Sequence, residues 1–333
     1  MASFKTILSS FALAAVALSA TAAEADQFSY TPELHGVIRA RWEMNTNSGM
    51  QRFRVRNARL TVGGKIHPTI SYFIQTEYDN SMMQILDAYG KFDIIKGLYA
   101  QAGQFRMPFG VEPFRAPANY IFANRSFMGN QIMNYRAVGA KVGYAIPNSP
   151  LTLEFGVFNP YTITFSGSQK WGKDVTYAGK ASFKLPEGFK LDLGYGSIKP
   201  NDNGLRANLI DGALSWENSN VLAAAEYMLK NYCGGHQKST HSYVAYVDWH
   251  KTVKWGAFNR WSIQGRFDGM TDHLELNKMV EQPGRKRATI GSILTYTYKA
   301  VHADVRMNYE KYFDYKEGGY SPDVFVTEVV FRF

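Results

Sequence analysis

Arginine is concentrated in two stretches of the chain, in a pattern that suits anion binding. Between residues 34 and 65 only Glu43 is acidic, whereas seven residues are basic: Arg39, Arg41, Arg52, Arg54, Arg56, Arg59 and Lys65. The segment 107–135 and its flanks contain Glu112 and four arginines: Arg106, Arg115, Arg125 and Arg136. Rings of arginine or lysine line anion pores because they replace part of the ion's hydration, and the planar guanidinium matches phosphate. The candidate pore-lining, anion-contacting residues are therefore Arg39, Arg41, Arg59, Arg106, Arg115 and Arg125.

A structural interpretation of the charges is also open. Eight carboxylates occupy the polar positions of alternating segments: Glu77, Asp87, Glu154, Asp192, Glu226, Asp248, Asp268 and Asp304. The basic side chains with which they could pair are Lys180, Arg260, Arg266 and Arg306. Paired charges would serve the fold rather than a solute.

Few other side chains suggest chemistry. Cys233 is the single cysteine, which excludes an internal disulfide and a cysteine-rich metal centre. Cys233 and His236, with His241 nearby, form either a metal site or a glycine-rich external loop, and the lack of further cysteines favours the loop. The sequence contains no G-x-S-x-G elbow and no phosphate-binding P-loop. We therefore expect no enzymatic activity, no catalytic residue, no cofactor and no bound metal.

The charged residues lie in segments whose polarity alternates with a period of two, which is typical of strands with one apolar and one polar face. Outside the N-terminus no apolar run reaches the roughly 18 residues that a spanning helix needs. The alternating segments are 34–43, 51–64, 69–79, 83–93, 98–106, 136–146, 151–158, 175–185, 188–197, 206–216, 220–230, 240–253, 259–269, 287–298, 301–310 and 323–333. Connections after even-numbered segments are short and those after odd-numbered segments are mostly long, as in outer-membrane barrels. The fold class predicted is all-β, a transmembrane antiparallel β-barrel of about 16 strands with short periplasmic turns and long extracellular loops.

The second segment is ambiguous. Arg52, Arg54 and Arg56 share the parity of the apolar Leu60 and Val62, so a strand without interruption would point all of them to one face. Either a β-bulge intervenes or the three arginines lie above the bilayer.

The N-terminus indicates export. Lys5 precedes an apolar core at 11–18, and small residues follow it, so residues 1–25 are predicted to be a signal peptide cleaved after Ala22, Ala23 or Ala25. Residues 26–333 then form the barrel domain. The final strand ends on Phe333, which we expect on the lipid face. Export excludes nucleic acid as a partner in practice, in spite of the formal net charge of +9.

The segment 107–135 is the longest connection and carries three prolines and several aromatic residues. Long connections without regular structure are uncommon unless they are functional or disordered, and a disordered loop would not hold so many aromatic residues. We expect this segment to fold inward as a constriction loop. An extracellular cap or a subunit contact is the alternative.

Three ordered motifs resemble the phosphate-selective porin O and P family: Arg56-Asn-Ala-Arg-Leu60 running into Gly63-Gly-Lys65, then Leu86-Asp-Ala-Tyr89, then Gly103-Gln-Phe-Arg-Met-Pro-Phe-Gly110. The likeness covers about residues 34–144. It implies a sixteen-stranded, trimeric, anion-conducting porin whose third loop folds into the lumen and whose arginines and lysines select phosphate. The segment 107–135 departs from that pattern because it contains no lysine.

Together these features predict a porin in the outer membrane of a Gram-negative bacterium that lets small solutes diffuse passively. We expect anion preference, with phosphate as a candidate solute, and a homotrimer in contact with outer-membrane lipid. The alternatives are a structural or adhesive barrel with a closed lumen and, less favoured by the sequence, an outer-membrane hydrolase.

Overall fold

The computed structural model describes residues 29–79, 82–112, 115–116, 119–132, 135–160, 171–199, 205–234, 238–275, 280–313 and 323–333. The predicted signal peptide lies outside these residues, as do His236 and parts of the segment 107–135. In the described ranges, no helix is long and apolar enough to cross a membrane.

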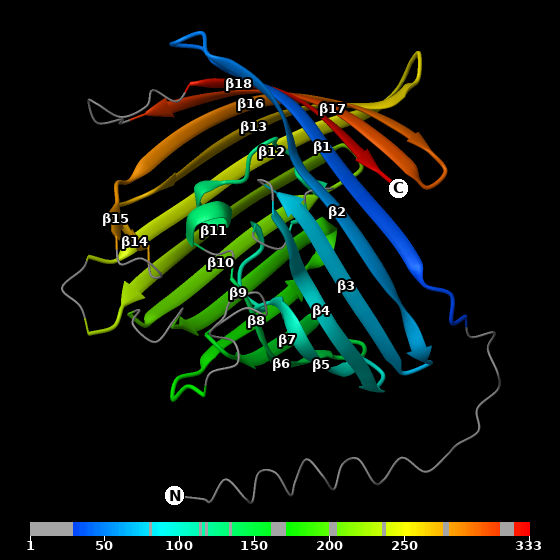
Figure 1. Cartoon of the computed structure of the whole chain (residues 1–333), viewed down its shortest axis with the longest axis vertical. Helices are drawn as coiled ribbons and strands as arrows, with labels where there is room; N and C mark the ends of the chain where they lie inside the picture. The colour runs from blue at the N-terminus through cyan, green and yellow to red at the C-terminus, as the bar shows by residue number, and fades with distance from the viewer. Residues whose placement is uncertain are drawn as a thin grey trace, which may run out of the picture. The chain divides into compact units, whose positions relative to one another are not determined.

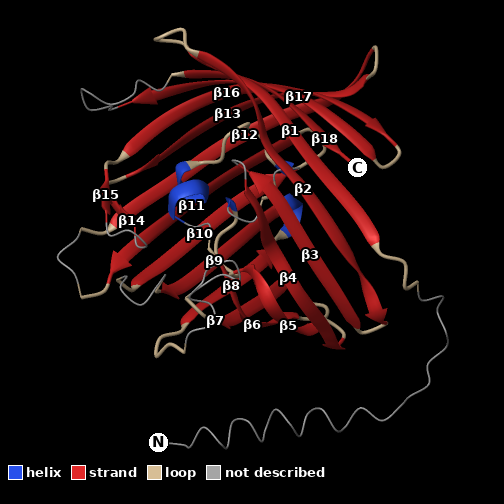
Figure 2. Cartoon of the chain, in the orientation of Figure 1, coloured by secondary structure: helices blue, strands red, loops and turns tan. Residues whose placement is uncertain are grey.

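Sixteen strands of the described chain close into one antiparallel barrel, which confirms the predicted fold class (Figures 1 and 2). Closure comes from β1 and β18, which pair from Val37–Arg332 to Asn45–Val324. The barrel therefore leaves no strand edge unpaired in lipid. Its strands are β1 (Glu33–Asn45), β2 (Gln51–His67), β3 (Ile70–Asp79), β4 (Met82–Ile95), β5 (Leu98–Arg106), β6 (Arg136–Ala145), β7 (Leu151–Phe158), β8 (Thr176–Lys184), β9 (Phe189–Ile198), β10 (Ala207–Glu217), β11 (Val221–Tyr232), β12 (Thr240–Trp255), β13 (Phe258–Met270), β16 (Arg285–Tyr298), β17 (Val301–Phe313) and β18 (Val324–Arg332).

The two faces of each strand follow the alternation of the sequence. In β17, Met307 and Tyr309 are exposed on the outer face, whereas Arg306, Asn308 and Glu310 are buried inside the barrel. An apolar outer face and a polar inner face are what a lipid-embedded barrel requires.

Short turns gather at one rim, where Gly256, at φ 60°, helps to form the two-residue turn between β12 and β13. The long connections lie at the other rim. One of them, between β13 and β16, contains a two-stranded hairpin that the sequence analysis did not anticipate, formed by β14 (His273–Glu275) and β15 (Val280–Gln282).

A β-bulge in β2 resolves the ambiguity of its arginines. Arg39 of β1 pairs with Asn57, but the next residue, Ala40, pairs with Val55, so Arg56 is the extra residue. The bulge reverses the parity of the part of β2 that precedes Arg56. As a result Phe53 and Val55 lie in exposed positions on the outer face. The side chains of Arg52 and Arg54 therefore lie on the same face as those of their partners Glu43 and Arg41.

The C-terminal residue packs and hydrogen-bonds at the junction between the last and first strands. The backbone N–H of Gly36 donates to the carbonyl of Phe333 at 2.9 Å. The Phe333 ring lies over Gly36, where a Cβ would come within 2.1 Å of Cζ. The ring is 49% exposed on the outer face, as the parity of the strand predicts.

The inside of the barrel contains an apolar core as well as charges. Buried aromatic and aliphatic residues of the 107–135 segment pack against the inner faces of β5, β6 and β9 to β12, in a cluster that includes Phe105, Met107, Phe109, Phe127, Met128, Ile198, Leu209, Met228 and Val244. The segment also forms a single helical turn, η3 (Met128–Ile132), visible inside the barrel outline in Figure 2. The barrel is therefore partly filled by its own loop.

Candidate functional site

The loop between β5 and β6 is bound to the inner wall of the barrel at several strands. The backbone N–H groups of Val111 and Glu112 donate to the two carboxylate oxygens of Glu226 on β11, at 2.7 and 2.8 Å. Further along, the Ala123 N–H donates to Asn308 on β17, at 2.6 Å. The Phe127 N–H donates to Asp268 on β13, at 2.8 Å. The loop therefore crosses the lumen rather than covering its outer mouth.

Aromatic contacts reinforce this docking. The Phe109 ring lies against Gly194 of β9, where a Cβ would sit only 3.0 Å from the ring, so this close approach depends on glycine. Phe122 meets Tyr246 edge to face with ring centroids 6.3 Å apart. Such aromatic pairs add to the burial of the rings themselves.

Arg39 and Arg41, two of the predicted anion contacts, lie between the wall and the loop. Both donate to Glu328 of β18, at 2.8 and 2.7 Å respectively. Both also donate to the carbonyl of Ala123, at 2.6 and 2.8 Å. Their exposed fractions are only 2% and 3%. In this arrangement the two guanidiniums hold the loop and share a carboxylate.

Arg59 and Arg106 lie on the part of the wall formed by β2 to β6. Arg59 is buried and donates to Glu77 at 2.6 Å. Arg106 is half-buried and lies within electrostatic reach of Arg136 and Arg125. Arg136 in turn pairs with Asp87 at 3.0 Å.

Four guanidiniums and two carboxylates therefore lie close together here. We call Arg59, Arg106, Arg125 and Arg136 the arginine cluster. Two acids adjoin it: Glu77 pairs with Arg59, and Asp87 pairs with Arg136.

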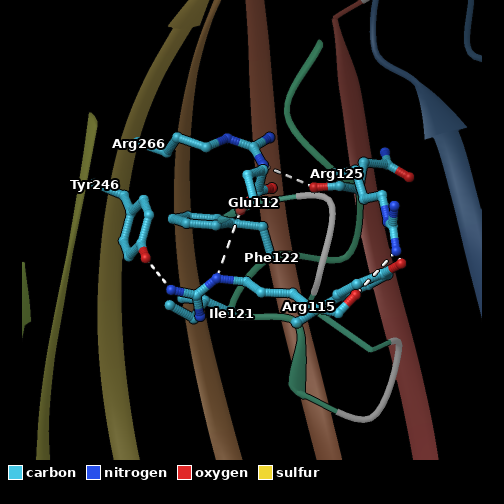
Figure 3. A pocket seen from close by; sticks show the side chains of 9 residues that line it. Glu112, Arg115, Ile121, Phe122, Arg125, Tyr246 and Arg266 are labelled. Atoms are coloured by element: carbon cyan, nitrogen blue, oxygen red, sulfur yellow. Dashed lines mark hydrogen bonds and ion pairs between the residues drawn. The ribbon is translucent and has the colours of Figure 1, made fainter. Parts of the chain in front are cut away.

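The two arginines within the loop turn toward other residues of the loop and wall. Arg115 lies between Glu112, at 3.5 Å, and the hydroxyl of Tyr246, to which it donates (Figure 3). Arg125 donates to the Tyr120 hydroxyl and to the carbonyl of Arg115, the latter at 2.9 Å. Together they border a cavity of about 10 Å³, too small for a solute larger than water.

The opposite wall is a network of paired charges. Arg287 of β16 donates to Asp268 and Glu310, at 2.9 and 3.0 Å. Arg266 of β13 contacts Asp268 at 3.1 Å and donates to the carbonyl of Asn124 at 2.7 Å. These four side chains are almost completely buried. The network fixes the loop to the wall and adds little net charge.

The structural interpretation that the sequence left open holds for the four basic residues named there. Each of the four proposed basic partners contacts a predicted acid: Arg260 with Asp248 at 3.1 Å, Arg266 with Asp268 at 3.1 Å, Lys180 with Asp192 at 3.3 Å, and Arg306 with Asp304 at 2.9 Å. In the described part of the chain, no group of three or more His, Cys, Asp or Glu is arranged to hold a metal ion.

Comparison with known proteins places this barrel in a family. Residues 43–333 match the family described as "Putative beta-barrel porin-2, OmpL-like". The chain belongs to this β-barrel porin family. The protein is accordingly located in the outer membrane of a Gram-negative bacterium.

Solved porins share the fold at low sequence identity. An anion-selective porin from Comamonas acidovorans is similar at a TM-score of 0.59 and 14% identity, covering 91% of this chain and 98% of that one. Salmonella typhi OmpF in complex with daunomycin is similar at 0.61 and 14%, covering 91% and 97%. OmpT of Vibrio cholerae is similar at 0.57 and 9%, covering 93% and 99%. No curated protein matches the sequence.

The matching family is described as OmpL-like, so the resemblance of this porin to phosphate-selective porins stays a prediction. Three charges that hold the loop were not singled out from the sequence: Glu310 and Arg287 contact it directly, and Glu328 acts through Arg39 and Arg41. The sequence showed only that all three occupy inward-facing positions of their strands. What they contact depends on where the loop docks, which parity does not specify.

Proposed function

We propose that this porin is a passive diffusion channel with a preference for small anions, in which the segment 107–135 acts as the constriction. The supporting observation is the arginine cluster. It lies where the docked loop approaches β2 to β6, and it brings Arg106 within electrostatic reach of both Arg125 of the loop and Arg136 of the wall. Guanidiniums gathered at a narrow part of a channel favour anions there, because they set the sign of the local potential.

The reversal potential across a tenfold KCl gradient in a planar bilayer tests the proposal. We expect the wild-type potential to indicate chloride preference, and Arg106→Gln to reduce that preference. Lys299→Gln, in the short turn between β16 and β17, is the control, because a rim charge is screened beyond roughly 10 Å at 0.1 M salt. Cation preference in the wild type would overturn the proposal.

Phosphate is the anion we propose as a preferred solute. Guanidiniums bind phosphate with paired, charge-assisted hydrogen bonds, and the three sequence motifs resemble those of phosphate-selective porins. Inorganic phosphate added to a chloride solution should therefore reduce the chloride current at millimolar concentration. Sulfate, which has similar size and charge, is the comparison. Equal block by both anions would show a general anion channel.

We further propose that the porin assembles as a homotrimer. One of the similar structures, of Vibrio cholerae OmpT, is described as a trimer form. Mass measurement of the detergent-solubilised porin tests this assembly, and a monomeric mass would contradict it.

A closed structural barrel is the second candidate, and one observation favours it. The described loop residues join an apolar cluster inside the barrel, and many inward charges are buried. Single-channel recording separates the two candidates. Absence of conductance from correctly folded protein would favour the closed barrel.

A further inference from the structure

The lipid-facing surface of the barrel has a hollow over β9 to β13. Its volume is about 570 Å³, within the range of roughly 300–1,000 Å³ typical of ligand pockets. The floor is formed by outward residues on β11, β12 and β13, four of which are small: Ala223, Ala225, Ala245 and Gly265. Val247 lies between Ala223 and Gly265 and also lines the hollow. Strand pairing places the small residues close together, since Ala225 pairs with Ala245, and Ala223 and Gly265 both pair with Val247.

Large side chains form the walls of this hollow. Trp216 of β10 and Phe189 of β9 lie on one side with ring centroids 6.2 Å apart. Phe267 of β13 stands on the other side and is 45% exposed. Small residues between large ones produce a concave apolar surface on a wall that is elsewhere convex. A hydrocarbon chain gains dispersion contacts on three sides in such a place.

A cation lies on the same outer surface, toward the short-turn rim. The ammonium of Lys251 sits over the rings of Trp249 and Trp261, 5.8 and 5.5 Å from their centroids. Trp255 packs on Trp261 at 5.3 Å. Lys251 is exposed, and no carboxylate of the described residues forms an ion pair with it.

The position of this cation relates it to the hollow. Lys251 follows Val247 by four residues in β12, roughly 13 Å along the strand at 3.3 Å per residue. Tryptophan is enriched where hydrocarbon meets the polar headgroups, and the short-turn rim of such barrels is periplasmic. The cation therefore lies at headgroup level and the hollow at acyl-chain level.

We propose that this surface binds one glycerophospholipid of the periplasmic leaflet, with an acyl chain in the hollow and the headgroup phosphate on Lys251. A second copy of the barrel fits less well, because a convex wall cannot fill a hollow and would cover an exposed cation with apolar residues. An amphiphile with an anionic head satisfies both features at once.

Filling the hollow tests the proposal. A Cβ added at Gly265 meets no atom within 4 Å, so the side chain of Gly265→Phe starts in open space and fills the hollow. Gly90 on β4 is equally open and exposed, and lies on a distant part of the wall, so Gly90→Phe is the matched control. Lys251→Gln tests the headgroup contact. The measurement is native mass spectrometry of the whole folded porin, incubated with palmitoyl-oleoyl phosphatidylglycerol.

We expect the wild type and Gly90→Phe to retain one lipid equally. Gly265→Phe should weaken retention at least tenfold, and Lys251→Gln several-fold. Equal retention by Gly265→Phe and the wild type would overturn the proposal. A second pair of results would also overturn the proposal: the wild type binds no lipid, and Gly265→Phe loses an oligomer that the wild type forms. The hollow would then be the contact site of a second copy. Should Gly265→Phe fail to assemble, Ala225→Leu narrows the same hollow and is judged by the same criterion.

Discussion

Removing the charge of Glu328 should destabilise the barrel and loosen its internal loop. Glu328 is completely buried and accepts hydrogen bonds from three guanidiniums, those of Arg39 at 2.8 Å, Arg41 at 2.7 Å and Arg306 at 3.4 Å. The first two arginines also hold the carbonyl of Ala123. Glu328→Gln would therefore leave buried cations without their shared counter-charge at the point where the loop is attached.

The size of the effect follows from the geometry. A contact of 2.8 Å, as between Arg39 and Glu328, corresponds to a Coulomb attraction on the order of 6 kcal/mol at an effective dielectric constant of about 20. Removal of one partner of a buried ion pair costs about 3–5 kcal/mol in practice. We expect Glu328→Gln to lower the free energy of unfolding by an amount in that range.

An exposed pair of the same length provides the control. Lys91 and Asp93 are also 2.8 Å apart, but their side chains are 33% and 45% exposed. Asp93→Asn changes the net charge by the same amount and should cost no more than about 1 kcal/mol, as surface ion pairs do. Urea titration of the folded protein in lipid vesicles measures both variants, and planar-bilayer recording should show larger or noisier conductance for Glu328→Gln. Equal destabilisation of the two variants would refute the assignment of Glu328 as the attachment point.

Three further outcomes are expected. Replacing Arg115 and Arg125 together by Glu should move the reversal potential in a KCl gradient toward cation preference; an unchanged potential would place both outside the permeation path. Asp211 is 3% exposed and lies against a second buried carboxyl group, that of Glu226. Asp211→Leu should therefore raise the free energy of unfolding by about 1–3 kcal/mol, and a decrease in urea titration would contradict this. Burial alone would raise the pKa of Asp323, but hydrogen bonds from the Lys311 ammonium and a backbone N–H lower it below its usual value. This stabilisation is present above the unfolded pKa and is lost as pH falls through the lower folded pKa. Asp323→Asn should therefore lower the free energy of unfolding at pH 7. In acid the free energies of unfolding of the variant and the wild type should become equal.

The strands and their pairing partners were largely determined by local sequence. Alternation with a period of two marks the barrel strands, with an interruption in β2, because lipid outside and polar groups inside impose opposite requirements on neighbouring residues. The same parity identified which acids point inward and which basic residues could pair with them, but the individual pairs, such as Lys180 with Asp192, come from the structure. Loop lengths then indicated which rim is which.

Local sequence was insufficient where one residue changes the register. The bulge at Arg56 adds one residue to β2 and reverses the parity of everything above it. Leu60 and Val62 share the parity of three arginines, which showed that an uninterrupted strand was inconsistent with two distinct faces. The position of the bulge, however, depends on the pairing with β1. The hairpin β14–β15 escaped prediction because each of its strands is only three residues long.

By itself the sequence determined a closed antiparallel barrel, the faces of its strands and the presence of a long aromatic loop, since these depend on short-range periodicity and chain length. The tertiary structure alone decided what the charges do. Arg39 and Arg41 have the same local pattern as Arg59, yet the first two are covered by the loop and shared with Glu328, almost three hundred residues away. A charge becomes a structural contact or a pore charge according to what is packed over it, and that depends on contacts between segments far apart in the chain.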